Sequence, residues 1–208
     1  MKHYEYVTKS EATPIKNELI DLIHLVQDEV REYFTFRYDF IGSAKRNMIT
    51  CDYKSNVGFD FDVNIRVNDE EEKFSAKEIR NILKRGFDKF GRHFSYDFAE
   101  DSKRVLTIKV KDVENSRIIH SCDFAVVHDA SDGRQQYIHF NKNQNTYEWQ
   151  YQPIGFYQLE EKITHIKKKG QWQEVRKLYL ESKNKNLDSN KKSRTIFAET
   201  VNTVYKRI

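Results

Sequence analysis

The sequence predicts an α+β fold in which a sheet domain, residues 1–155, precedes a small helical subdomain, residues 156–208. Residues 58–68 alternate cleanly between apolar and polar side chains, which is the pattern of a half-buried strand. Residues 13–33 repeat apolar side chains at helical spacing, and three more helical segments follow Pro153. Because the strands are grouped in the middle of the chain and helices follow them, this order favours an α+β domain with a helical tail.

Composition limits the class of protein to an aromatic-rich globular chain. The 208 residues fit one domain, or one domain with a small appendage. Aromatic residues make up 13 %, which excludes wholesale disorder despite a charged fraction of 33 %. No apolar run approaches the roughly 18–20 residues of a membrane span, and residues 1–10 lack a signal-peptide core. We therefore expect a cytoplasmic protein that does not enter a membrane.

The charge is divided unevenly along the chain, although the net value is only +4. Residues 161–208 contain 13 Lys and Arg against 5 Asp and Glu, whereas residues 1–160 contain 23 against 27. A basic C-terminal segment of this kind is either a solvated helical face or a surface that attracts a polyanion such as a nucleotide or nucleic acid.

The first elements are a helix and a short strand. For the helix at 13–33, Thr13 is a suitable N-cap and Pro14 suits the first helical position. Residues 36–41 are predicted to form the strand, because aromatic residues recur at alternate positions. The mixed residues 44–56 are compatible with a short helix or a loop.

The remaining elements follow the strand at 58–68. The capping-box sequence Ser-Ala-Lys-Glu at 75–78 predicts a second helix that ends near Gly91. Three further strands are predicted from alternation or apolar runs, at 105–111, 118–127 and 135–141. The boundary at Pro153 and Gly155 precedes the helical tail, in which we predict helices at 156–169, 172–182 and 194–207.

Three carboxylates stand out by their positions. Asp60 and Asp62 lie two residues apart on one strand, so their side chains leave the same polar face. Asp123 lies inside an apolar strand, where a carboxylate is costly unless it is paired or binds a metal. If the two strands are neighbours, the three carboxylates converge, and such hard oxygen ligands suit Mg²⁺ or Mn²⁺. Each carboxylate could instead form an ion pair or simply lie at the surface.

A second feature lies upstream of these carboxylates. Gly42 and Ser43 end the predicted strand at 36–41 and open the next segment. Backbone N–H groups and a hydroxyl at such a corner can bind an anion, which would place phosphates beside a metal held by Asp60 and Asp62. The order of strand, Gly-Ser, Asp-x-Asp strand and later Asp strand is far more specific than any one of these features.

With these motifs the sequence resembles the DNA polymerase β-like nucleotidyltransferase superfamily. The motifs that carry the resemblance are Phe40-Ile41-Gly42-Ser43, Phe59-Asp60-Phe61-Asp62-Val63 and Asp123 before Phe124. Gly-Ser followed by Ala-Lys-Arg-Asn looks most like the branch of oligoadenylate synthases and bacterial cyclic-oligonucleotide synthases, of which this chain would be a minimal member. The resemblance implies a catalytic sheet with helices on one face, followed by a helical subdomain.

The resemblance also implies an activity and a set of site residues. An NMP would move from an NTP such as ATP to a hydroxyl acceptor, with release of pyrophosphate. The metal ligands and catalytic residues would be Asp60, Asp62 and Asp123, with Mg²⁺ or Mn²⁺, and Asp123 could also act as general base. The substrate phosphates would be bound by Gly42, Ser43, Lys45, Arg46 and Lys183. A nucleotide or nucleic acid is a possible acceptor.

Other functions remain open at this point. The chain could be a catalytically silent module that binds a nucleotide, a nucleic acid or a partner protein. It could be a nuclease that uses the same carboxylates, or a nucleotidyltransferase of the toxin–antitoxin type. No Gly-x-x-x-x-Gly-Lys-Ser/Thr loop, Gly-x-Gly-x-x-Gly fingerprint or Cys-x-x-Cys motif supports a different class. The base, the acceptor and the oligomeric state are not predicted.

Overall fold

The computed structural model describes residues 2–69, 72–153, 155–156 and 158–208. The chain divides into two compact units, which we name by their content. The sheet unit comprises Val7–Ile49 and Ser55–Gln152. The helical unit comprises Met1–Tyr6, Thr50–Lys54 and Pro153–Ile208, so two N-terminal segments belong to the same unit as the C-terminal helices.

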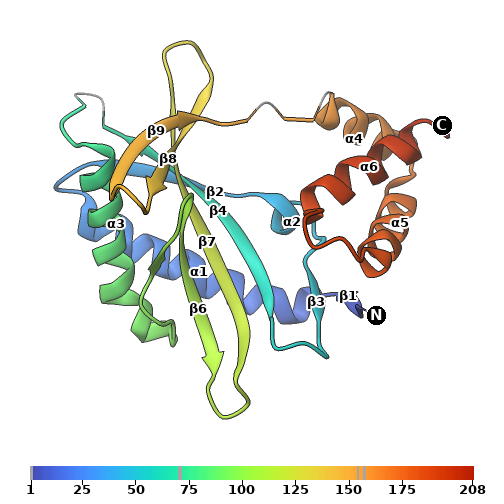
Figure 1. Cartoon of the computed structure of the whole chain (residues 1–208), viewed down its shortest axis with the longest axis horizontal. Helices are drawn as coiled ribbons and strands as arrows, with labels where there is room; N and C mark the ends of the chain where they lie inside the picture. The colour runs from blue at the N-terminus through green and yellow to red at the C-terminus, as the bar shows by residue number, and fades with distance from the viewer. Residues whose placement is uncertain (1, 70–71, 154, 157) are drawn as a thin grey trace. The chain divides into compact units, whose positions relative to one another are not determined.

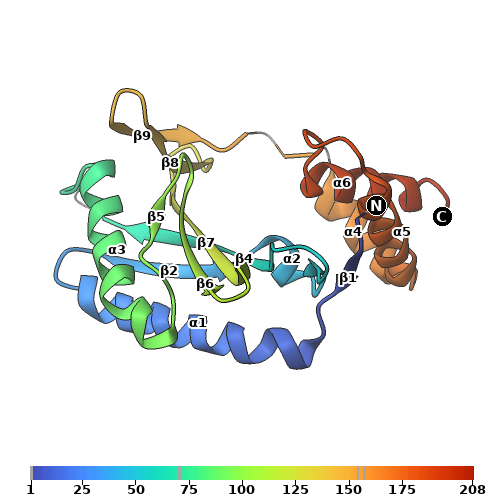
Figure 2. The ribbon, with the colours of Figure 1, turned by 60° about the horizontal axis from the view of Figure 1, so that its bottom comes forward.

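Figure 1 labels most elements of both units, and Figure 2 also labels β5. Those of the sheet unit are α1 (Lys9–Val30), β2 (Thr35–Phe40), α2 (Gly42–Lys45), β4 (Phe59–Asn68), α3 (Ala76–Phe90), the 3₁₀ turn Gly91–Phe94, β5 (Glu100–Asp101), β6 (Val105–Asp112), β7 (Arg117–Asp129), β8 (Gln135–Asn141) and β9 (Thr146–Tyr151). Those of the helical unit are β1 (Tyr4–Tyr6), β3 (Thr50–Asp52), α4 (Leu159–Lys168), α5 (Trp172–Lys185) and α6 (Ser193–Tyr205). The α+β class predicted from the sequence is confirmed.

The sheet unit is built on a mixed seven-stranded sheet. Its main path runs β2-β4-β7-β6-β5, and β8 joins β7 to β9. The central pair β4 and β7 is parallel, whereas every other described pair is antiparallel. The strands carrying Asp60, Asp62 and Asp123 are therefore direct neighbours.

Helices α1 and α3 cover one face of this sheet, as Figure 2 shows. On β4 the covered face is the apolar set of alternate residues, all buried: Phe59, Phe61, Val63, Ile65 and Val67. On β7, Phe124 stacks on Phe87 of α3 with ring centres 4.2 Å apart. The sequence alternation therefore separates a buried apolar face from an open face that carries the polar residues of β4.

The predicted start of the first helix is wrong by about one turn. The N-cap is Thr8 rather than Thr13, because Thr8 and Glu11 form a complete capping box. The Glu11 main-chain N–H donates to the Thr8 hydroxyl, and the Glu11 carboxylate accepts from the Thr8 main-chain N–H at 2.9 Å. Two capped N–H groups outweigh the suitability of Pro14 for the first helical position, so Pro14 lies inside the helix. The helix also ends at Val30, before the predicted end at residue 33.

The helical unit joins α4, α5 and α6 to a two-stranded antiparallel pair, β1 with β3. The side chain of Asn184 on α5 bonds both main-chain groups of Tyr4, accepting at 2.6 Å and donating at 3.0 Å. The three predicted tail helices are present, with ends shifted by a few residues. Residue 157 of the predicted helix at 156–169 lies outside the described residues. In the part of the chain that the structure describes, no helix has both the length and the apolar character needed to cross a bilayer.

Candidate active site

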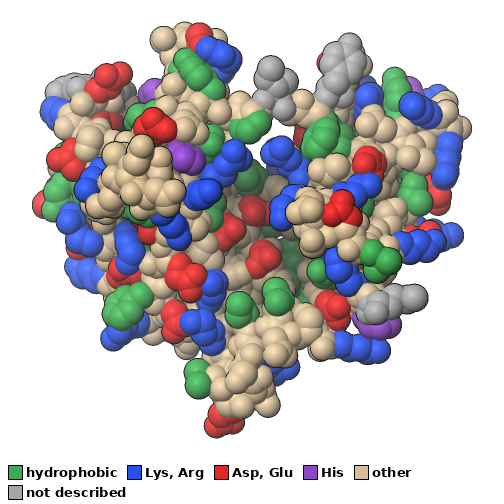
Figure 3. All heavy atoms as spheres, in the orientation of Figure 1, with side chains coloured by type: hydrophobic (Ala, Val, Ile, Leu, Met, Phe, Trp, Pro, Cys, Tyr) green, Lys and Arg blue, Asp and Glu red, His purple; other side chains and the backbone are tan. Residues whose placement is uncertain are grey.

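Three carboxylates lie on the open face of two adjacent strands. In the parallel pairing of β4 and β7, Asp62 is opposite Asp123, and Asp60 is opposite Ser121. Residues that are directly opposed share a face, so all three carboxylates leave the same side of the sheet. Figure 3 views this face and shows acidic side chains grouped near the middle of the sheet.

The three carboxylates influence one another electrostatically. Burial raises the pKa of Asp62 from 3.8 to about 6, and the charges of Asp123 and Asp60 add to this effect. Burial also raises the pKa of Asp123, and the charge of Asp60 raises it further, while a hydrogen bond from Thr107 opposes the rise. Mutual repulsion of this kind is expected where carboxylates converge without a cation.

Two hydroxyl groups orient the carboxylates, and neither of them was among the residues predicted from the sequence. The Thr107 hydroxyl on β6 donates to Asp123 Oδ1 at 2.5 Å, and the Ser121 hydroxyl donates to Asp60 Oδ1. Thr107 is directly opposite Asp123 in the β6–β7 pairing. The alternation of β6 places Thr107 on a polar face, but only the strand order shows that this face adjoins Asp123.

The turn that contains Gly42 and Ser43, which we call the Gly-Ser corner, lies against one of these carboxylates, Asp62. The Ile41 main-chain N–H donates to the Asp62 carbonyl at 2.9 Å, which fixes the end of β2 beside β4. Gly42 has a positive φ of 58°, and a Cβ atom built on it would lie 2.6 Å from Asp62 Oδ2. Ser43 follows in the one-turn helix α2. The main chain at Gly42 therefore approaches Asp62 more closely than any other amino acid would allow.

The basic residues predicted to bind phosphate differ in their contacts and in the unit to which they belong. Arg46 folds back on the corner, and its Nη1 donates to the Gly42 carbonyl at 3.0 Å. Lys45 is exposed at the end of α2. Lys183 belongs to α5 of the helical unit, where its Nζ donates to Thr50 Oγ1 at 2.6 Å and lies 4.1 Å from the centre of the Tyr4 ring. The sheet unit thus brings Gly42, Ser43, Lys45 and Arg46 to one corner, and Lys183 is described only within its own unit.

The donor set suits a hard divalent cation, although its oxygens are not gathered around one point. Among the described residues, no three His, Cys, Asp or Glu side chains form a group that could hold a metal ion as they stand. One oxygen of Asp60 and one of Asp123 accept hydroxyl hydrogen bonds instead. The set fits Mg²⁺ or Mn²⁺ by its chemistry, because it is made of carboxylates whose repulsion a cation would relieve.

Substituting Gly42 by Ala is expected to displace the Asp62 carboxylate. Gly133 offers a matched control, because it also has a positive φ, of 78°, but a Cβ atom added to it would meet no described atom within 4 Å. We expect both variants to lose about 1 kcal/mol of unfolding free energy through backbone strain. Only Gly42→Ala should also weaken the predicted Mn²⁺ binding, measured by calorimetry. Equal Mn²⁺ affinity in the two variants would contradict a role for the close Gly42–Asp62 approach.

The raised pKa of Asp62 predicts a specific dependence of stability on pH. Because the folded protein holds the proton more tightly than the unfolded chain, stability is greatest below the unfolded value and falls as pH rises through about 6. A pKa shift of this size changes the free energy of unfolding by about 3 kcal/mol at most. Urea unfolding of the wild type and of Asp62→Asn should therefore diverge between about pH 4 and pH 7, with the variant becoming the more stable protein. If the difference in unfolding free energy between the two proteins stayed constant across this range, the pKa of Asp62 would not be raised in the folded protein.

The fold is similar to that of solved structures of polymerase β-like nucleotidyltransferases, at low sequence identity. Solved structures of a bacterial cyclic dinucleotide synthase share this fold: Vibrio cholerae DncV, a cyclic AMP-GMP synthase, in complex with the linear intermediate pppA(3′,5′)pG matches with a TM-score of 0.61 and 13 % identity. The match covers 96 % of this chain and 54 % of that chain. The similarity agrees with the branch suggested by the Gly-Ser motif.

Two further structures show the same similarity. Vibrio cholerae DncV in complex with GTP and 5MTHFGLU2 matches with a TM-score of 0.60 and 13 % identity over 96 % of this chain and 55 % of that one. Escherichia coli DncV bound to 3′-deoxy GTP matches with a TM-score of 0.59 and 13 % identity over 96 % and 54 %. This chain therefore spans about half the length of the chains it matches. No protein-family model and no curated protein sequence matches it.

Proposed function

We propose that the protein is a metal-dependent nucleotidyltransferase that moves an NMP from an NTP to a hydroxyl acceptor and releases pyrophosphate. The observation that carries the proposal is the placement of Asp60, Asp62 and Asp123 on adjacent strands, with the main chain of Gly42 against Asp62. Solved structures that share the fold bind GTP and a linear dinucleotide intermediate. Residues 1–155 would form the catalytic domain and residues 156–208 the helical subdomain.

The carboxylates would share the binding of two Mg²⁺ or Mn²⁺ ions. Bound there, the cations would orient the triphosphate and increase the acidity of the attacking hydroxyl. Asp60 and Asp62 would hold the ion that carries the triphosphate, and all three carboxylates would hold the other. Asp123 is suited to accept the proton of the acceptor hydroxyl, because its raised pKa makes it a stronger base than an ordinary carboxylate.

The remaining site residues would bind the phosphates. The main chain of Gly42 and the hydroxyl of Ser43 would hold the β- and γ-phosphates beside Asp62. Lys45 and Arg46 lie at the same corner and would neutralise phosphate charge. Lys183 stays a phosphate-binding residue proposed from the sequence, and the structure describes it within the helical unit.

Two hydroxyl groups would support the carboxylates. Thr107 and Ser121 would keep Asp123 and Asp60 oriented while the substrate is absent, because each already donates a hydrogen bond to one carboxylate oxygen. The second oxygen of each carboxylate would then be the first to meet an arriving cation.

A catalytically silent nucleotide-binding module is the second candidate, and one observation favours it. The carboxylate oxygens accept hydroxyl hydrogen bonds, and among the described residues they do not already surround a common point. A silent module would bind an NTP through Gly42 and Ser43 without releasing pyrophosphate.

One experiment tests the proposal against this alternative. The protein is incubated with each of the four NTPs, labelled at the α-phosphate, with Mg²⁺ or Mn²⁺, and both pyrophosphate and labelled product are measured. The same NTP supplies a 3′-hydroxyl, so a nucleotide can serve as acceptor. We expect pyrophosphate release that EDTA abolishes. Nucleotide binding without pyrophosphate, seen as a thermal shift with every NTP, would favour the silent module and contradict the proposed activity.

A further inference from the structure

Strand β2 forms a free edge of the sheet. Among the residues that the structure describes, β2 pairs only with β4 and has no strand on its other side, as Figure 2 shows beside α1. The Ile41 N–H bonds the Asp62 carbonyl of β4, so odd-numbered residues of this segment direct their main-chain groups inward. The main-chain groups of Phe36, Tyr38 and Phe40 therefore point away from the sheet.

The outer edge of β2 lacks several of the features that commonly prevent pairing with another strand. It contains neither Pro nor Lys, and its pairing with β4 is in unbroken register. Its two charged residues, Arg37 and Asp39, have opposite signs. Among the described residues, one side chain hydrogen-bonds a main-chain group of this edge: Gln27 on α1, whose Nε2 donates to the Phe36 carbonyl at 2.8 Å. His24 and Lys16 of α1 contact the Tyr38 and Phe40 side chains. A groove of about 400 Å³ lies beside the Gln27 contact, lined by residues of α1 together with Thr35 and Phe36 of β2.

The sequence of β2 is nearly palindromic: the kinds of side chain follow the same order from either end of the strand. Phe36-Arg37-Tyr38-Asp39-Phe40 has Tyr38 at its centre, a charged residue on each side and a Phe at each end. If a second copy pairs antiparallel about Tyr38, each Phe36 faces a Phe40 and each Arg37 faces an Asp39. The outward-pointing main-chain groups of the three aromatic residues then exchange hydrogen bonds in pairs, as an antiparallel ladder requires.

The charges of this strand are incompletely matched within one chain. Arg37 is exposed and lies directly opposite Arg66 in the β2–β4 pairing. Arg66 has two carboxylates near it, Asp129 and Asp39, the latter at 3.7 Å. Arg37 has no carboxylate partner in the part of the chain that the structure describes. Like charges directly opposite destabilise a sheet, and Asp39 of a second copy would supply the missing negative charge.

We propose that the protein forms a two-fold symmetric homodimer by antiparallel pairing of β2 with β2 of a second copy. The two sheets then become continuous through Tyr38. Because opposed residues share a face, the open faces with Asp60, Asp62 and Asp123 lie on the same side of the joined sheet. The dimer does not depend on the proposed catalytic activity, since β2 pairs through its main chain and its Arg37–Asp39 charges.

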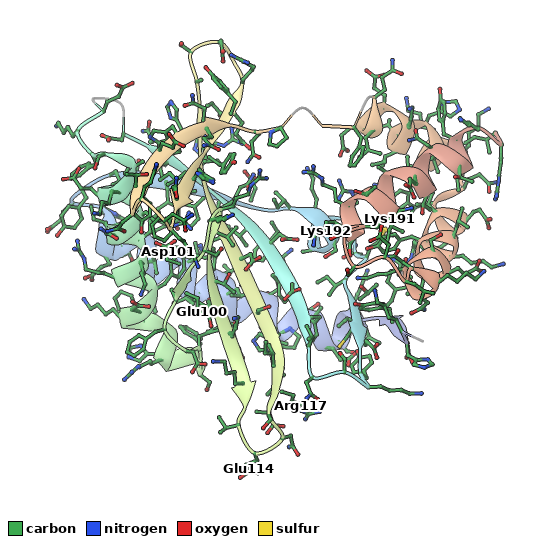
Figure 4. The ribbon with its side chains drawn as sticks, in the orientation of Figure 1. Glu100, Asp101, Glu114, Arg117, Lys191 and Lys192 are labelled. Atoms are coloured by element: carbon green, nitrogen blue, oxygen red, sulfur yellow. The ribbon has the colours of Figure 1, made fainter. Side chains whose placement is uncertain are left out.

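Charge reversal on β2 tests this dimer. The full chain is studied by sedimentation equilibrium from about 1 µM to about 300 µM, a range that detects weak specific association. Arg37→Asp and Asp39→Arg should each raise the dimer dissociation constant by about tenfold or more, because both symmetric pairs become repulsive. The double variant Arg37→Asp with Asp39→Arg restores opposite charges and should regain the wild-type constant. Glu114→Lys, at the tip of the β6–β7 hairpin labelled in Figure 4, is the charge-reversal control.

Hydrogen exchange locates the interface independently of the variants. Raising the protein concentration should slow exchange of the main-chain N–H groups of Phe36, Tyr38 and Phe40, and Arg37→Asp should remove this effect. The fold is expected to survive this substitution, because it places a carboxylate opposite Arg66. The proposal is overturned by a chain that stays monomeric throughout, by single variants that dimerise like the wild type, or by a dimer whose β2 amides show no added protection.

Discussion

Asp62→Asn and Asp123→Asn are each expected to lower the proposed nucleotidyl transfer by about a hundredfold to a thousandfold, the range seen when one electrostatic stabiliser is removed from an active site. Asn keeps the shape of the side chain but removes the negative charge that would hold the cation. Neither variant should unfold the protein, because both carboxylates have raised pKa values and their charges repel in the folded state. The measurement is pyrophosphate release at saturating NTP and Mg²⁺, together with urea unfolding.

Asp129→Asn provides the matched control for these variants. Asp129 lies on the same strand as Asp123 and an even number of residues away, so it occupies the same face. Its charge pairs with Arg66 at an exposed position. We expect this variant to retain turnover within about twofold, because exposed ion pairs contribute little. Full turnover in Asp62→Asn and in Asp123→Asn would show that these carboxylates are not the catalytic ones.

Asp101→Asn is expected to destabilise the sheet unit by about 3–5 kcal/mol, because it leaves a buried charge without its partner. Arg80 of α3 is fully buried, and its Nε and Nη2 donate to Asp101 Oδ1 at 3.1 and 2.8 Å. Tyr147 of β9 donates to the other carboxylate oxygen at 2.8 Å. Asp101, labelled in Figure 4, therefore connects α3, β5 and β9 through one carboxylate.

The exposed pair of Arg31 and Asp28 is the control for this effect. Its two atoms are 2.6 Å apart, but about 70 % of each side chain is exposed. Asp28→Asn should cost at most about 1 kcal/mol, because water already solvates both charges. Urea unfolding of the two variants should therefore differ severalfold in lost free energy. Equal losses of unfolding free energy in the two variants would mean that the burial of Arg80 does not determine how much Asp101→Asn destabilises the protein.

The hydrophobic pattern is sufficient to predict most elements of the sheet unit. The alternation of β4 and the capping box at Ser75 depend only on neighbouring residues, so both are predictable and both are present. The strand β9 is not predicted, because its turn from β8 contains neither Gly nor Pro, although Tyr147, Trp149 and Tyr151 alternate. The strand β1 has three residues, and its partner β3 lies more than forty residues away, so no local signal predicts the pair.

The candidate site is predictable in part. The residue types and spacing select Asp60, Asp62, Asp123 and the Gly-Ser corner, and the structure places these on adjacent strands and at the end of β2. Their roles in binding a metal and an NTP stay our proposal. Thr107 and Ser121 carry no separate signal, because a hydroxyl on a polar strand face is ordinary until the neighbouring strand is known.

Sequence patterns are sufficient to predict which residues face the core, where most helices and strands lie, and which carboxylates occupy unusual positions. These properties follow from the periodicities of helices and strands, which act over a few residues. The folded chain is needed to see that β4 pairs in parallel with β7, that β2 is a free edge among the described strands, and that Gly42 lies against Asp62. Strand order depends on contacts between residues far apart in the chain, and a local pattern does not encode which distant strand becomes the neighbour.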